Sequence, residues 1–332
     1  MIISRTPFRI SFFGGGTDYP AFYEENGGAV LSTSINKYCY VTCRYLPPFF
    51  DYKYAIRYRK REETKTISEI QHPSMRECLN FVNFDHGIEI QHNADLPAMS
   101  GLGSSSAFTV GLLNALYALK GKMTTKRQLA LDAIHVEQDR IRENVGSQDQ
   151  TITAFGGFNK IEFGGRQKIA VYPIIIDQDK LDSLQSHLML FFTGFSRNAS
   201  EIAGELIRKT PEKNTELKAM MGMVEEALNV LNGSQDRLMD FGKLLHETWK
   251  IKRSLTPRIT NSFIDEVYET AMGAGALGGK LLGAGGGGFI LFFVNPELQH
   301  NVSEKLGKLL YVPFRFENLG SQIIYYTLED NF

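Results

Sequence analysis

The sequence predicts a fold of mixed strands and helices, built as two units that pack against each other. Strand-like runs separated by glycine turns fill residues 2–46. Helical patterns follow over about 104–144, and a stretch that starts near residue 180 is mostly helical to about 275. A length of 332 residues fits one large or two medium domains. We therefore expect a first unit over 1–178 and a second over 179–332, with a binding site between them.

The first unit opens with strands, of which 10–13 and 38–43 are the clearest. The segment 51–71 is basic and aromatic, which fits either nucleic-acid binding or a solvated hairpin. Its alternation and its nearby acidic residues favour the hairpin. Short strands return over 152–173, again with paired glycines at their turns.

Two helices follow the hairpin. The first, over about 104–120, has apolar residues at helical spacing, and Gly121 is its expected C-cap. The second covers about 125–144, and Thr125 with Gln128 resembles a capping box at its start.

The second unit begins with a buried strand over 188–192 and a loop that leads into helices. Strands over 278–282 and 289–294 then flank a glycine-rich segment. A helix over about 296–310 and two terminal strands complete the expected order.

Composition excludes several classes of protein. The chain has 36 basic and 37 acidic residues, which gives no electrostatic footprint for nucleic acid or for an anionic membrane. No apolar run approaches the ~18 residues that span a bilayer, and the first residues do not form a secretory signal. Cys39, Cys43 and Cys78 are too few for a disulfide framework and lack a zinc spacing. We expect a cytoplasmic protein with reduced cysteines.

The most informative segment is a Gly/Ser loop, residues 101–106, which runs directly into the first helix. A helix start offers free N–H groups and the positive end of the helix dipole, and glycines allow an anion to come close to the backbone. This pattern indicates a polyphosphate site. A serine-rich N-cap on a core helix is the plainer alternative.

Other phosphate-binding motifs are absent from the sequence. There is no Gly-x-x-x-x-Gly-Lys-Ser/Thr segment, and the protein-kinase motifs His-Arg-Asp and Asp-Phe-Gly are missing. The glycine loop, residues 283–288, matches the dinucleotide pattern Gly-x-Gly-x-x-Gly, but it leads into an expected strand instead of a helix.

Three segments in order resemble the motifs of the GHMP small-molecule kinases: residues 6–19, the Gly/Ser loop within 95–110, and residues 280–289. The resemblance spans nearly the whole chain. It implies an α+β fold with a ribosomal-protein-like N-terminal unit and a ferredoxin-like C-terminal unit. It also implies ATP and Mg²⁺ as cofactors.

The resemblance assigns roles to residues. Asp149 would take the acceptor's hydroxyl proton and Arg9 would assist it. Magnesium would be held by Ser105 and by Glu137, which lies twelve residues before Asp149, with Asp139 and Glu143 as competing carboxylates. The nucleotide would be held by Gly101, Leu102, Gly103, Ser104, Ser105, Ser106, Gly285 and Gly286.

A second set would bind the acceptor substrate: Gly16, Thr17, Asp18, Tyr19, Thr193, Gly194, Arg197 and Gly287. The Thr-Asp-Tyr triplet matches sugar kinases of the family, and mevalonate-type kinases lack it. Gly15-Gly16 replaces the Glu-His of galactose enzymes, which argues against galactose. Arg197 is placed for an anionic group on the acceptor, with Lys250 and Arg253 as further basic candidates. Trp249 could belong to the same pocket or pack in the core.

Taken together, the motifs look most like the bacterial heptose-phosphate kinases of the family, which phosphorylate the anomeric hydroxyl of D-glycero-D-manno-heptose 7-phosphate. The expected partners are a sugar phosphate and ATP, with no nucleic acid and no membrane, and a homodimer is a possible assembly. A different sugar-1-kinase such as an L-fucokinase is the alternative enzyme. A regulator that binds sugar and ATP without turnover is disfavoured by Asp149, Arg9 and Ser105, and a diphosphomevalonate decarboxylase by Thr17-Asp18.

Overall fold

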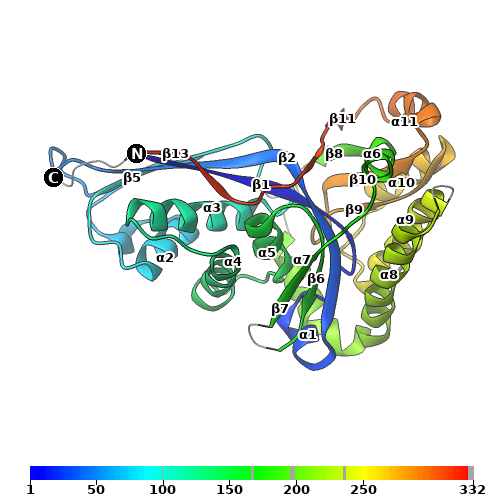
Figure 1. Ribbon diagram of the computed structural model, residues 1–332, viewed down its shortest axis with the longest axis horizontal. Coiled ribbons are helices and arrows are strands. Elements are labelled where there is room, and N and C mark those ends of the chain that lie inside the picture. The colour runs from blue at the N-terminus through cyan, green and yellow to red at the C-terminus, as the bar shows by residue number, and fades with distance from the viewer. Residues whose placement is uncertain (99, 166–167, 195–198, 235–236, 328–332) are drawn as a thin grey trace.

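The computed structural model describes residues 1–98, 100–165, 168–194, 199–234 and 237–327. Its strands form two sheets, one of nine strands and one of four. Helices of the first half of the chain gather along the large sheet (Figure 1). Helix α9 (Leu238–Leu255) packs on β9 and β10 of the small sheet, and α8 (Asn214–Asn232) packs against α9 and against β1 and β2. The expected mixture of strands and helices is confirmed.

The large sheet has the order β13-β1-β2-β5-β3-β4, with β6, β7 and β12 attached through β2. The 18-residue strand β2 is long enough to pair with β1 and then with both β5 and β6. The expected hairpin at 51–71 is present as β3 and β4. The strand bounds are β1 Ile2–Phe13, β2 Gly28–Tyr45, β3 Tyr54–Arg57, β4 Arg61–Thr64, β5 Ile88–Ala94, β6 Phe158–Phe163, β7 Ile169–Pro173, β12 Phe316–Glu317 and β13 Gln322–Tyr326.

Helix α3 (Ser104–Leu119) contacts β1 and β2 and is buried over most of its surface. The next helix, α4 (Lys126–Ile134), is capped as expected, since Thr125 Oγ1 accepts a hydrogen bond from the Gln128 N–H at 3.1 Å. The continuous helix expected to residue 144 instead becomes a π-helix, His135–Ile141, and stops at Arg142, whose φ is 62°. The remaining helices of this half are α1 Pro20–Asn26, η1 Ile67–Glu69, α2 Pro73–Phe81 and α5 Gln148–Phe155.

The small sheet has the order β11-β8-β10-β9. Strand β10 lies inside it and is buried at every position, which explains its continuous apolar sequence. Its strands are β8 Leu188–Gly194, β9 Ala276–Leu281, β10 Gly288–Val294 and β11 Leu310–Tyr311. The surrounding helices are α6 Gln178–Ser186, α7 Ala199–Lys209, η3 Thr210–Lys213, α8, α9, α10 Ser262–Gly273, η5 Pro296–Leu298 and α11 Gln299–Lys305.

The end of the chain returns to the first sheet. The helix expected over 296–310 is a short 3₁₀ turn followed by α11, and the chain then forms β11, β12 and β13 instead of two terminal strands. Strand β13 pairs with β1 and β12 pairs with β2. Figure 1 accordingly places the N-terminus beside β13. The division at residue 178 stays a prediction.

The three cysteines form no disulfide bond. Cys39, Cys43 and Cys78 are free and buried, as expected. Among the described helices, none is both long and apolar enough to cross a membrane.

Candidate functional site

A cavity of about 410 Å³ lies where segments from both sheets meet. Its walls come from the end of β1 and the turn after it, the Gly/Ser loop, the start of α5, the last turns of α9, and the start of the glycine loop. The lining residues that concern the chemistry are Arg9, Ser11, Gly15, Gly16, Asp18, Tyr19, Gly101, Gly103, Ser104, Ser105, Ser106, Glu143, Gly146, Gln148, Asp149, Lys252, Lys280, Gly283 and Ala284. The expected position of the site, between the two parts of the chain, fits this cavity.

The Gly/Ser loop packs against the glycine loop, and glycine is required at the contact. Gly101 has a φ of 83°, and a Cβ placed there would lie 2.5 Å from the Leu282 carbonyl oxygen. Gly103, with a φ of 74°, is the N-cap of α3, and the helix begins at Ser104. The helix N-terminus therefore faces the cavity, as a polyphosphate site requires. Leu102 is buried, and its carbonyl oxygen accepts from the Arg9 N–H at 3.1 Å.

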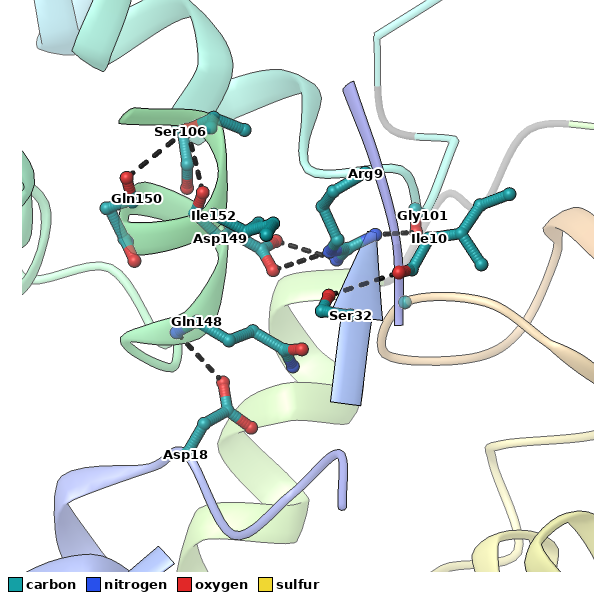
Figure 2. Close-up of polar contacts among 12 residues, drawn as sticks. Arg9, Ile10, Asp18, Ser32, Gly101, Ser106, Gln148, Asp149, Gln150 and Ile152 are labelled. Atoms are coloured by element: carbon teal, nitrogen blue, oxygen red, sulfur yellow. Dashed lines mark hydrogen bonds and ion pairs between the residues drawn. The ribbon is translucent and has the colours of Figure 1, made fainter. Parts of the chain in front are cut away.

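Arg9 and Asp149 form a two-point ion pair at the cavity wall (Figure 2). Arg9 Nε and Nη2 each donate to one carboxylate oxygen of Asp149 at 2.7 Å, and Nη1 donates to the Gly101 carbonyl oxygen at 2.7 Å. Arg9 is buried on β1, whereas the Asp149 side chain is 24% exposed and lines the cavity. Asp149 lies in the first turn of α5, so the helix start positions its backbone.

Asp18 lies deeper in the cavity and is 2% exposed. Its carboxylate accepts from the Gly16 N–H at 3.0 Å and from the Gln148 N–H at 3.4 Å, the latter drawn in Figure 2. Burial, reinforced by the negative charge of Asp149, raises the pKa of Asp18 to about 6. Gly146 makes room for it, because a Cβ there would lie 1.9 Å from Asp18 Oδ2. A buried carboxylate of this kind is suited to bind hydroxyl groups.

Substituting Asp18 by Asn is expected to weaken binding of the acceptor and to leave nucleotide affinity unchanged. The loss of a charged hydrogen-bond acceptor to a buried hydroxyl costs about 1.5–3 kcal/mol. The acceptor's KM and the nucleotide's Kd, measured on the same variant, separate the two sites. Equal weakening of both ligands would place Asp18 outside the acceptor pocket.

Glu137 lies on the π-helix and is fully buried. Its Oε2 accepts from Ser106 Oγ at 2.8 Å and from Gln150 Nε2, while its Oε1 has no hydrogen-bond partner among the described residues. Burial raises the pKa of Glu137 to about 7. Ser106 contacts this carboxylate, and Ser105, the expected magnesium ligand, is exposed at the cavity.

A partnerless carboxylate oxygen close to a serine-rich helix start suits a hard cation, so these residues fit magnesium. Among the described residues, no cluster of three or more His, Cys, Asp or Glu side chains could hold a metal. Phosphate oxygens of a nucleotide and water would therefore supply most of the coordination.

Substituting Glu137 by Gln is expected to raise the magnesium concentration required for half-maximal rate, because a neutral amide binds the cation less strongly than a carboxylate. A magnesium titration of initial rates measures this. Glu143→Gln is measured beside it, because Glu143 is the competing carboxylate and lines the cavity. If Glu143→Gln alone shifts the titration, the wrong carboxylate has been chosen. Ser105→Ala and Ser106→Ala, titrated in parallel, distinguish the two hydroxyls.

Several predicted residues do not line the cavity. The Thr17 hydroxyl donates to the carbonyl oxygens of Gly14 and Ala29, and so stabilises the turn that presents Asp18. Thr193 Oγ1 donates to the Gly288 carbonyl oxygen, which ties the end of β8 to β10. The residues not found on the cavity wall are Leu102, Thr17, Glu137, Thr193, Gly194, Gly285, Gly286 and Gly287; Glu137 reaches the site through Ser106, which does line it. Arg197 lies outside the described residues.

Two lysines at the cavity were missed in the sequence. Lys252 on α9 donates to the carbonyl oxygens of Leu281 and Gly283, each at 2.7 Å, and Lys280 on β9 donates to the Phe12 carbonyl oxygen at 2.7 Å. Lys250 and Arg253, the basic candidates predicted from the sequence, lie on the same helix as Lys252. They pair with Glu247 and Asp265 respectively and do not line the cavity. Trp249 packs in the core beside Tyr268, in line with the packing alternative.

Helical periodicity could have revealed Lys252. The buried face of α9 contains Leu245, Thr248, Trp249 and Leu255. Lys252 follows Thr248 by four residues and precedes Leu255 by three, so it lies on that face. A lysine on a buried helical face is a signal of function that the motif comparison did not use.

Comparison with known proteins agrees with this arrangement. A model of the GHMP kinases N terminal domain matches residues 68–157, and a model of the GHMP kinases C terminal region matches residues 223–312; together they cover more than half of the chain. The chain is 28% identical over 321 residues to a D-glycero-alpha-D-manno-heptose 7-phosphate kinase of Campylobacter jejuni, covering 92% of this chain and 93% of that protein. It is 29% identical over 243 residues to a mevalonate kinase of Thermococcus sibiricus, covering 69% of this chain and 67% of that protein.

Among solved structures, a D-glycero-D-manno-heptose 1-phosphate kinase from Bacteroides thetaiotaomicron superposes with a TM-score of 0.73. The two sequences are 23% identical, and the superposition covers 98% of this chain and 100% of that one. This similarity confirms the expected α+β fold.

The helix start, the ion-paired carboxylate and the two family models together define the chain as a phosphotransferase that uses ATP and an alcohol acceptor. The chain belongs to the GHMP kinase family.

Proposed function

We propose that this kinase phosphorylates the anomeric hydroxyl of D-glycero-D-manno-heptose 7-phosphate, on a route to nucleotide-activated heptose. The observation that carries the sugar assignment is Asp18, a buried carboxylate that lines the same cavity as Asp149. A relative that aligns with most of both chains is named as a heptose 7-phosphate kinase, and its similarity supports the choice of sugar.

The cavity has further polar groups suited to a polyhydroxylated acceptor. Ser11 Oγ and Gln148 Oε1 are buried, line the cavity and have no hydrogen-bond partner among the described residues. Buried polar atoms without partners are costly, so a ligand that pairs with them gains affinity. Sugar hydroxyls can both donate to and accept from such groups.

The proposed reaction assigns each group a task. The acceptor oxygen attacks the γ-phosphorus of ATP, its proton goes to the Asp149 carboxylate, and the bond from the γ-phosphorus to the bridging oxygen breaks to release ADP. Arg9 holds Asp149 through two hydrogen bonds and so fixes the direction of its carboxylate. Magnesium, held by Glu137 and a serine of the Gly/Ser loop, would neutralise charge on the nucleotide phosphates.

An assay of ATP consumption across acceptors tests the proposal. Heptose 7-phosphate should give a kcat/KM far above those of unphosphorylated heptose, L-fucose, galactose, mannose and mevalonate, and the product should carry phosphate at the anomeric carbon. A preference for L-fucose would favour the L-fucokinase alternative. Binding of sugar and ATP without ADP formation would favour a regulator.

A further inference from the structure

Lys252 is a basic residue at the cavity wall that pairs with no carboxylate in the described part of the chain. It is half-buried near the end of α9, and among the described residues no carboxylate lies within ion-pair distance of its ammonium group. Its two observed hydrogen bonds go to the carbonyl oxygens of Leu281 and Gly283. An ammonium group has three N–H donors, so one remains for a ligand.

The glycine loop connects this ammonium group to the Gly/Ser loop and to Arg9. Gly283, whose carbonyl it binds, packs on Gly101, since a Cβ on Gly283 would lie 2.5 Å from Gly101 Cα. The Gly101 carbonyl oxygen in turn accepts from Arg9, which holds Asp149. Lys252 is therefore connected, through Gly283, Gly101 and Arg9 in turn, to the group that would accept the hydroxyl proton.

The charged groups of the cavity include no carboxylate paired directly with Lys252 among the described residues. Lys280, Arg9, Asp18, Asp149 and Glu143 line the same cavity, and Arg9 and Asp149 already neutralise each other. Burial, together with the positive charge of Arg9, lowers the pKa of Lys252 to about 7, and Asp18 opposes this shift. A phosphoryl group bound directly to the ammonium group would supply a counter-charge at contact distance and would favour the ammonium form.

We propose that the Lys252 ammonium group binds a phosphoryl group in the cavity. This phosphoryl group is either the one transferred from ATP or one that the acceptor already carries. In the first case Lys252 is a catalytic residue that stabilises charge on the transferring group; in the second it determines specificity for phosphorylated acceptors. The first case rests on the kinase activity alone, and the second rests on the function proposed above.

A purely structural role would require the two carbonyl contacts and no charge. Lys280 offers a contrast, because it is 2% exposed and ties β9 to the Phe12 carbonyl oxygen on β1. Lys250 offers a matched control, because it lies on the same helix, is exposed and pairs with Glu247. The variants to compare are Lys252→Met, Lys252→Gln, Lys252→Arg and Lys250→Met.

The experiment measures kcat, the acceptor's KM, the Kd of a non-hydrolysable ATP analogue and the midpoint of thermal unfolding in each variant. The acceptor is whichever sugar the wild-type enzyme turns over best, so an error in the proposed sugar is seen first and separately. We expect Lys252→Met and Lys252→Gln to lose activity, Lys252→Arg to restore most of it, and Lys250→Met to behave as wild type.

The kinetic pattern distinguishes the two sources of the phosphoryl group. A fall in kcat of about 10²–10³-fold, with any acceptor, assigns Lys252 to the transferring group. A higher KM for the phosphorylated acceptor, with an unchanged rate on the unphosphorylated sugar, assigns it to the acceptor's own phosphate. Lys252→Gln retains N–H donors for the two carbonyl groups but has no charge. Wild-type turnover in a folded Lys252→Gln enzyme would overturn the proposal.

Discussion

Substituting Asp149 by Asn is expected to lower kcat by about 10²–10⁴-fold and to change the Kd of ATP little. The carboxylate lines the cavity and is fixed by Arg9, so it is placed to accept the hydroxyl proton. An amide of the same shape cannot accept that proton. Some rate should remain, because positioning and electrostatic stabilisation supply much of the catalysis in phosphoryl transfer. Steady-state kinetics and calorimetric titration with an ATP analogue measure the two quantities.

Asp139→Asn is the matched control for this variant. Asp139 belongs to the π-helix, is mostly exposed and contacts His135, so the same chemical change there should leave kcat unchanged. The thermal unfolding midpoint of Asp149→Asn shows whether the loss of the ion pair with Arg9 also affects the fold. Near-wild-type turnover in Asp149→Asn would remove the assignment of this residue as the base.

The sequence predicted best what depends on local pattern. Apolar spacing located α3 almost to the residue, and one half of the expected capping box is formed, the bond from the Gln128 N–H to Thr125 Oγ1. The uninterrupted apolar run of β10 matches its position inside the small sheet. These features can be predicted from a short stretch of sequence. Helix periodicity and capping depend on neighbouring residues, and a continuous apolar run is typical of a buried strand.

What the sequence did not predict depends on distant contacts. The pairing of β13 with β1 joins the two ends of the chain, and nothing in the local pattern of either strand specifies the partner. The contact of Ser106 with Glu137 depends on how α3 packs against the π-helix, which no local pattern specifies. Lys252 was overlooked for a different reason. Helical periodicity places it on the buried face of α9, but it belongs to none of the three family motifs.

Substituting Arg9 by Met is expected to lower kcat by about 10²–10³-fold relative to the wild type. Three nitrogens of the Arg9 guanidinium already have protein partners: Nε and Nη2 donate to Asp149 and Nη1 to the Gly101 carbonyl oxygen. Arg9 is therefore a positioning residue that acts mainly through Asp149. Arg5→Met on the same strand, where Arg5 lies over the Tyr38 ring, is the control for loss of an arginine from β1.

A double-mutant cycle tests whether Arg9 works through Asp149. If it does, Arg9→Met combined with Asp149→Asn should be little slower than the slower single variant, because the second substitution removes an interaction that is already lost. Multiplicative losses would instead show that Arg9 contacts the transferring phosphoryl group independently. Arg9→Lys separates charge from geometry, since lysine retains the positive charge but cannot form the two parallel hydrogen bonds. A strongly impaired Arg9→Lys enzyme with a normal unfolding midpoint would identify the direction of the Asp149 carboxylate, and not the local charge, as what Arg9 contributes.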